Sequence, residues 1–116
     1  MPKKIMIIDD DPTVVQYLQA VFSDNGYATC TAYSTSEALE LVKKEKPDLI
    51  TLDLQLPGEW GSRFYRKLRK VKELKEIPII VISGIHGDHA VKDAIAFVAK
   101  PFDPEKVIGI VKNTIG

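Results

Sequence analysis

Three short runs of consecutive, mostly apolar residues set the strongest constraint on the fold of this chain. They occupy positions 5–8, 49–52 and 79–82 and are rich in isoleucine and valine. A strand with one face in water alternates apolar and polar residues, so unbroken runs of this length are typical of strands buried on both faces, as in a parallel sheet. Weaker runs at 28–32 and 96–99 are candidates for two further strands.

Helical segments separate these runs, and most have a recognisable start or stop signal. Asp11, which precedes a proline, predicts an N-cap, and Gly26 closes the helix that follows. Ser34 begins a second helix with the spacing of a capping box, and Asp103 repeats before the last helix the Asp-Pro signal of the first. A further helix is predicted over 62–71.

The predicted elements alternate between strand and helix five times over. Such alternation gives an α/β fold, in which a parallel sheet with right-handed crossovers carries helices on both faces. For five units the common doubly wound, flavodoxin-like strand order is 2-1-3-4-5, which makes the first and third strands neighbours at the point where ligands bind. We therefore predict this five-stranded sheet with five helices. Residues 1–116 contain no low-complexity linker and are predicted to form one domain.

The composition narrows the class of function. Sixteen basic and sixteen acidic residues give a formal net charge of zero, so no overall field favours nucleic acid or an anionic membrane, and we expect neither as a partner. The single cysteine, Cys30, cannot form an internal disulfide, and no apolar stretch has the length of a membrane span. We therefore expect a cytoplasmic protein. The basic stretch 66–75 indicates a solvated face, with an acidic partner as the less favoured alternative.

Polar side chains follow four of the five predicted strands. Asp9 and Asp10 follow the first, Asp53 the third, Ser83 the fourth and Lys100 the fifth. Because the carboxyl ends of parallel strands meet at one edge of a sheet, we expect these side chains to gather in one crevice. Three carboxylates there would raise one another's pKa unless a cation neutralised them, and such ligands select Mg²⁺ or, as a second option, Mn²⁺. The competing explanation, acids that complement a helix dipole, leaves the serine and the lysine unexplained.

Four motifs built on these residues resemble the signatures of response-regulator receiver domains of two-component signalling. They are IIDDDP, LDLQLPGEWG, IVIS and AKPF, in the order in which that family carries them, and the resemblance covers essentially the whole chain. It implies that Asp53 accepts a phosphoryl group from a phosphohistidine donor, which is a sensor histidine kinase or a histidine phosphotransfer protein. The phosphorylated domain would then control a partner or an output domain.

The resemblance also implies a ligand set for Mg²⁺. Asp10, Asp53 and the backbone carbonyl of Gln55 are expected to bind the ion, and Asp9 is expected to hold waters of its shell. This set is consistent with the general preference of Mg²⁺ for carboxylate, carbonyl and water oxygens.

Three further residues receive roles from the same resemblance. Lys100 is expected to bring positive charge to the phosphoryl oxygens and Ser83 a hydroxyl donor, and the bond between Lys100 and Pro101 is expected to be cis. Phe97 lies where the family carries an aromatic residue that turns inward when the hydroxyl residue moves toward the phosphate. The simpler alternative, that Phe97 is an ordinary core or edge aromatic, stays open.

The chain departs from the family pattern between Ser83 and Lys100, where it is shorter by more than one helical turn. The fourth helix, expected within 84–95, is therefore predicted to be short, displaced or loose, which puts the usual output face in doubt.

Three functions follow from this sequence. The favoured one is a signalling switch that is not an enzyme in the ordinary sense, because it catalyses only its own phosphorylation and dephosphorylation. The first alternative is a receiver-like interaction module that is never phosphorylated. The second, an aspartate-based phosphatase, is disfavoured because Gln55 occupies the place where that chemistry generally needs a second acid.

Overall fold

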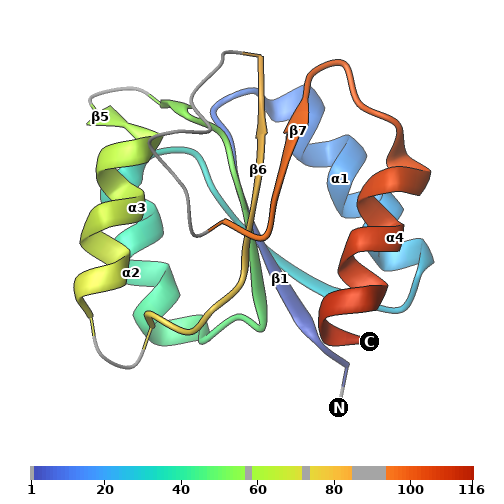
Figure 1. The fold of residues 1–116 in the computed structure, drawn as a ribbon, viewed down its shortest axis with the longest axis horizontal. Helices are drawn as coiled ribbons and strands as arrows, with labels where there is room; N and C mark the ends of the chain where they lie inside the picture. The colour runs from blue at the N-terminus through green and yellow to red at the C-terminus, as the bar shows by residue number, and fades with distance from the viewer. Residues whose placement is uncertain (1, 57–58, 72–73, 85–93) are drawn as a thin grey trace.

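A five-stranded parallel sheet forms the centre of the molecule in the computed structural model, which describes residues 2–56, 59–71, 74–84 and 94–116 (Figure 1). Its strands, in chain order, are β1 (Lys4–Ile8), β2 (Ala28–Ala32), β3 (Leu49–Leu52), β6 (Ile79–Ser83) and β7 (Ala96–Ala99). They are arranged as β2-β1-β3-β6-β7, with every neighbouring pair parallel. The predicted doubly wound order 2-1-3-4-5 is therefore confirmed.

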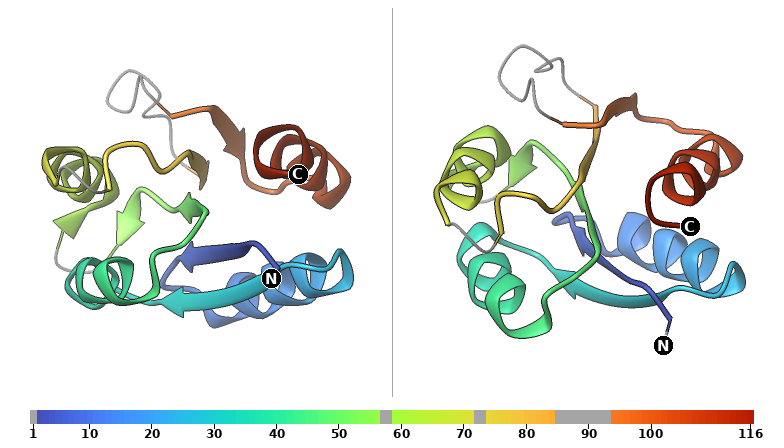
Figure 2. Two further views of the ribbon diagram at one scale, coloured as in Figure 1. Left: turned by 90° about the horizontal axis from the view of Figure 1, so that it is seen from below. Right: turned by 60° about the horizontal axis from the view of Figure 1, so that its bottom comes forward.

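Helices cover both faces of the sheet, as Figure 1 and Figure 2 show. On one face lie α1 (Pro12–Asp24) and α4 (Pro104–Ile115), and on the other lie α2 (Thr35–Glu45) and α3 (Gly61–Lys70). These four agree with the predicted first, fifth, second and third helices. The fourth helix, predicted within 84–95, falls largely on 85–93, outside the described residues. No helix in the described part of the chain is both long and apolar enough to cross a bilayer.

The sheet separates two hydrophobic cores because successive side chains of a strand point to opposite faces. Met6 and Ile8 of β1 pack toward α2 and α3, in the core that contains Phe64. Ile5 and Ile7 pack toward α1 and α4, in the core that contains Phe22. Each fully buried side chain of this size stabilises the fold by roughly 1.5–3 kcal/mol relative to its exposed state, so burial on both faces explains the unbroken apolar runs.

Side-chain caps fix where the helices begin. Asp11 and Asp103 each accept a hydrogen bond at 2.9 Å from the amide two residues later, at the start of α1 and of α4. Ser34 accepts one from the Glu37 amide at 3.3 Å at the start of α2. Gly26 follows α1 with a φ of +86°, a left-handed conformation that glycine adopts without steric cost. The predicted helix boundaries are confirmed at these positions.

A short hairpin between β3 and α3 was not predicted from the sequence. Its strands, β4 (Gln55–Leu56) and β5 (Glu59–Trp60), pair antiparallel, with Gln55 opposite Trp60. Strands of two residues are too short to show the alternation by which a strand is recognised in a sequence. The hairpin shapes the backbone directly after Asp53.

Candidate functional site

The site lies at the carboxyl edge of the sheet, where the backbone ladder continues for one residue beyond the strands. The amide of Asp53 donates to the carbonyl of Ile8 at 2.9 Å, and the amide of Lys100 donates to that of Ser83 at 3.0 Å. The amide of Asp9 donates to the last carbonyl of β2 at 3.2 Å. These side chains are therefore positioned by the regular backbone of the sheet rather than by loops, and the predicted gathering at one edge is confirmed.

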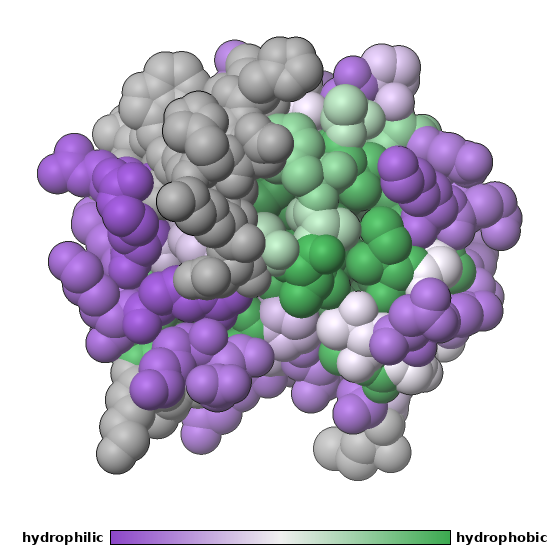
Figure 3. Space-filling model, in the orientation of Figure 1, coloured by the Kyte–Doolittle hydropathy of each residue, from purple (hydrophilic) through white to green (hydrophobic). Residues whose placement is uncertain are grey.

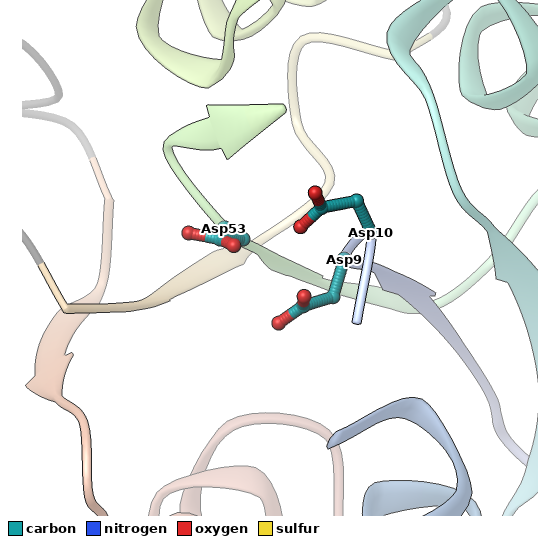
Figure 4. A group of neighbouring side chains, drawn as sticks. All are labelled: Asp9, Asp10 and Asp53. Carbon is teal, nitrogen blue, oxygen red and sulfur yellow. The ribbon is translucent and has the colours of Figure 1, made fainter. Parts of the chain in front are cut away.

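Three carboxylates meet at the ends of β1 and β3, as Figure 4 shows. Asp9, Asp10 and Asp53 each offer an oxygen such that all three atoms lie within 4.8 Å of one another. Asp9 is 3% exposed and Asp53 is 4% exposed, whereas Asp10 lies at the surface. The group thus combines two buried acids with one acid that is exposed to solvent.

Lys100 supplies positive charge to this group. Its Nζ lies 2.8 Å from Oδ2 of Asp9 and 3.3 Å from Oδ2 of Asp53. Its side chain is 22% exposed, so both contacts are partly shielded from water. The predicted strand order had Lys100 at this edge and the family resemblance implied a role toward phosphoryl oxygens, but the direct ion pair with Asp9 was not predicted.

The carboxylate of Asp53 is held by groups on both of its oxygens. Oδ1 accepts a hydrogen bond from the hydroxyl of Ser83 at 3.0 Å and another from the amide of Gln55 at 3.1 Å. Oδ2 faces the ammonium of Lys100. Charge-assisted hydrogen bonds of this kind orient a carboxylate strongly. Asp53 is therefore a preoriented carboxylate, and the predicted proximity of Ser83 and Lys100 to it is confirmed.

The pKa values of Asp9 and Lys100 both lie above their ordinary values, for different reasons. Burial raises the pKa of Asp9 and the charge of Asp53 adds to this, although the hydrogen bonds from Lys100 and from the Asp11 amide oppose it. Burial alone would lower the pKa of Lys100, but the hydrogen bond and charge of Asp9, together with those of Asp53, outweigh it. The cluster therefore favours the charged form of Lys100.

The donor set fits a hard divalent cation. Carboxylate oxygens are the ligands that Mg²⁺ prefers, and oxygens of these three acids lie within 4.8 Å of one another, close enough to be gathered around one ion. Both oxygens of Asp9 already accept hydrogen bonds, from Lys100 and from the Asp11 amide, which suits a role toward metal-bound water. Asp11 itself is turned away as the cap of α1.

Two other expectations concern the neighbourhood of β7. The bond between Lys100 and Pro101 is cis, as the family resemblance implied. Phe97 is half-buried and packs against the core beneath α2 and α3. Its role as a switch residue, and that of the Gln55 carbonyl as a metal ligand, stay predictions.

Comparison with known proteins gives consistent matches over almost the whole chain. The family described as response regulator receiver domain matches residues 5–112. Protein Rrf1 of Nitratidesulfovibrio vulgaris is 32% identical over 99% of this chain and 84% of its own length. Sporulation initiation phosphotransferase F of Bacillus subtilis is 32% identical over 97% of this chain and 94% of its own. The activated receiver domain of Klebsiella pneumoniae RstA superimposes with a TM-score of 0.86 at 25% identity, over 97% of each chain.

Proposed function

Because this chain belongs to the response regulator receiver domain family, we propose that residues 1–116 act as one receiver domain whose phosphoacceptor is Asp53. The observation that carries this proposal is the setting of the Asp53 carboxylate. It is buried at the end of β3, hydrogen-bonded to Ser83 and paired with Lys100, and it lies within metal-ligand spacing of two further acids.

The proposed reaction transfers one phosphoryl group. A carboxylate oxygen of Asp53 forms a bond to the phosphorus of a phosphohistidine while the nitrogen–phosphorus bond breaks, and the imidazole leaves with the electron pair and takes up a proton. Water later attacks the phosphorus of the aspartyl phosphate, which releases inorganic phosphate and restores the carboxylate. Catalysis is limited to these two events on the protein itself.

The proposed metal ligands are Asp10, Asp53 and the backbone carbonyl of Gln55, with Asp9 on the water shell. Mg²⁺ is the first choice and Mn²⁺ the second, since both accept carboxylate, carbonyl and water oxygens. When bound, the ion offsets the negative charge of the acids and of the phosphoryl oxygens. The carboxylate cluster supports this assignment.

Lys100 and Ser83 are proposed to contact the phosphoryl oxygens after the transfer. Both already contact Asp53, so each needs only a small movement to reach a group attached to that residue. Ser83 would leave its place on Oδ1 of Asp53 as it moves, and Phe97 is proposed to turn into the space so vacated. Phe97 is half-buried and stands opposite Val81, two residues before Ser83 on β6, which puts Phe97 and Ser83 on the same face of the sheet and supports this coupling.

The proposed phosphodonor is a sensor histidine kinase or a histidine phosphotransfer protein, and the phosphorylated form would act on a partner or an output domain. This assignment rests on the family and on the chemistry of Asp53. The cytoplasmic location predicted from the sequence remains part of the same proposal.

The test is phosphorylation by acetyl phosphate, followed by intact mass with and without Mg²⁺. We expect a gain of one phosphoryl group that depends on Mg²⁺. Acetyl phosphate can serve as the donor because its carboxyl–phosphate bond breaks in place of the nitrogen–phosphorus bond of phosphohistidine. Asp53→Asn should show no gain, whereas Asp24→Asn, which changes an exposed acid at the end of α1, should behave as the parent protein. No gain in the parent together with no Mg²⁺ binding would favour the unphosphorylated interaction module.

A further inference from the structure

A groove of about 530 Å³ lies at the amino edge of the sheet, far from the acidic cluster. Its described lining comes from the C-terminal end of α2 and from three residues between α3 and β6: Lys43, Lys46, Pro47, Val71, Leu74 and Ile77. Pro47 precedes β3 whereas Asp53 follows it, and a strand of this length spans about 13 Å at roughly 3.3 Å per residue. The groove and the phosphoacceptor therefore occupy opposite ends of the same strand.

The floor of the groove is apolar and recessed. Leu74 is 4% exposed, and Val71 and Ile77 are half-buried, so these side chains can be touched only by a group that enters the groove. The volume falls in the range that accommodates a small ligand or two to three apolar side chains. The floor therefore favours a ligand with protruding apolar groups.

The rim of the groove is basic. Lys43 and Lys46 are exposed at its α2 side. On the neighbouring helix α3, whose ten residues include no acid, Arg66 and Lys70 are exposed as well. None of these four side chains takes part in an ion pair among the residues that the structure describes. Figure 3 shows hydrophilic residues over the side of the molecule where α2 and α3 lie. Glu40, one turn before Lys43, and Glu76, directly before Ile77, are exposed on the same segments, so the four basic side chains give a local excess of positive charge in a chain of zero net charge.

We propose that this α2–α3 groove binds an acidic amphipathic segment of a partner protein, most simply a helix with two apolar residues one turn apart among Asp and Glu. The apolar residues would fill the groove and the acids would face the rim and α3. Charge complementarity favours this occupant over a small anionic molecule, because Arg66 and Lys70 on α3 add positive charge beyond the two lysines that line the groove.

Two other anionic occupants fit the surface less well. A nucleic acid backbone needs the positive charge but leaves a recessed aliphatic floor unused. An anionic membrane needs apolar side chains that protrude into it, whereas Leu74 and its neighbours lie below the rim. The combination of a recessed apolar floor with an extended basic rim is satisfied by an acidic peptide segment.

The position of the groove gives this interaction a definite consequence. A partner held at the amino edge of the sheet leaves the carboxyl edge, with Asp53, open to a phosphodonor. The protein would then bind the acidic partner and exchange phosphoryl groups at the same time, and the two activities would be separable by mutation.

The first experiment selects peptides on the full 116-residue protein. A phage-displayed library of random 16-residue peptides is panned against the immobilised chain, and enriched peptides are synthesised with a fluorescent label and titrated by anisotropy. We expect enriched sequences to combine Asp and Glu with apolar residues spaced three or four apart. Replacing the acids of such a peptide with Gln should weaken its binding at least tenfold.

The second experiment locates the binding. Lys43→Glu should weaken the selected peptides at least tenfold, and Lys112→Glu should not, although Lys112 is likewise an exposed lysine in the last turn of a helix. Circular dichroism and urea unfolding check that both variants fold. Selected peptides that bind both variants equally, or a selection that yields no acidic, apolar peptide, would overturn the proposal.

The remaining arms separate other occupants and the proposed function. Dodecanoate and vesicles that contain phosphatidylglycerol test for an anionic lipid. If either binds in a way that depends on Lys43, and no peptide binds, the proposal is overturned in favour of a lipid. Lys43→Glu should gain a phosphoryl group from acetyl phosphate as fully as the parent. If the peptides do not bind but the protein still gains a phosphoryl group, only the proposal for the groove is contradicted. If the peptides bind but no phosphoryl group is gained, only the proposal that Asp53 is the phosphoacceptor is contradicted.

Discussion

The ammonium of Lys100 lies 2.8 Å from the carboxylate of Asp9, and this contact joins residues 91 positions apart in the chain. Asp9 follows β1, the second strand of the sheet, and Lys100 follows β7 at the far edge, so the contact bridges the ends of the two intervening strands. The contact closes the acidic cluster from one side. The charge balance of the site therefore depends on residues that follow strands far apart in the sheet.

Removing this lysine should destabilise the protein. Lys100→Met keeps much of the side-chain volume but leaves the buried carboxylate of Asp9 without its cation, so we expect the free energy of unfolding to fall by about 1–3 kcal/mol at neutral pH. Urea unfolding measures the change. The loss should shrink when Mg²⁺ is added, because the ion then supplies positive charge. Lys112→Met, at an exposed position, should change the free energy by less than about 0.5 kcal/mol, and equal effects of the two substitutions would contradict this account.

Two adjacent acids should differ sharply in their importance for metal binding. Asp10→Asn removes a proposed ligand, so we expect Mg²⁺ affinity, measured by calorimetric titration, to fall at least about tenfold. Asp11→Asn is the matched control, since asparagine caps a helix as well as aspartate does and Asp11 points away from the cluster as the cap of α1. Similar losses in both variants would mean that general negative charge, and not a specific ligand, attracts the ion.

The cap of α4 offers a test of stability away from the site. Asp103→Ala removes the acceptor for the Glu105 amide, and we expect the free energy of unfolding to fall by about 1 kcal/mol. Asp103→Asn should restore most of that loss because it keeps the acceptor. Urea unfolding of the three proteins decides the matter, and an alanine variant as stable as the parent would show that water replaces the cap without cost.

Cys30 should be a slow nucleophile in the folded protein. Burial raises the pKa of its thiol from an ordinary 9.0 to about 11, the charge of Glu45 adds to this, and Lys4 opposes it. A rise of two pKa units lowers the thiolate fraction at pH 8 about a hundredfold. We therefore expect iodoacetamide to alkylate the native protein at least that much more slowly than the protein in urea, as followed by intact mass.

The same thiol links stability to alkaline pH. Its pKa is higher in the folded chain than in the unfolded chain, so the folded state holds the proton more tightly and loss of the proton favours unfolding. The contribution is constant below pH 9 and declines as the pH rises from 9 toward 11. Cys30→Ala should remove that part of the decline, and an unchanged pH profile in this variant would show that other groups cause it.

Much of the fold followed from the sequence because it rests on local patterns. The apolar runs located all five strands of the sheet to within one residue at each end, and the signals at Asp11, Ser34 and Asp103 located three helix starts. The alternation of elements then restricted the strand order to few possibilities. The convergence of Asp9, Asp53 and their neighbours followed from that order alone.

The features that the sequence did not predict depend on distances in the folded chain. The pairing of Lys100 with Asp9 depends on how far one side chain reaches along the sheet edge, which no local pattern encodes. The hairpin at Gln55 has strands too short to be recognised by periodicity. The groove beside Lys43 arises where the end of α2 meets the segment after α3, and neither segment shows a groove by itself.

The register between β1 and β3 limits where the length of this chain can vary. Ile8 stands opposite Leu52, so Asp9 and Asp53 each come one residue after a matched pair. Since side chains alternate between the two faces, deleting one residue inside either strand would turn its acid to the other face and exchange the core residues before it. An insertion at the exposed turn of Asn25 and Gly26 shifts neither strand. Insertions and deletions should therefore be tolerated at turns of this kind and excluded from the strands that end in the site.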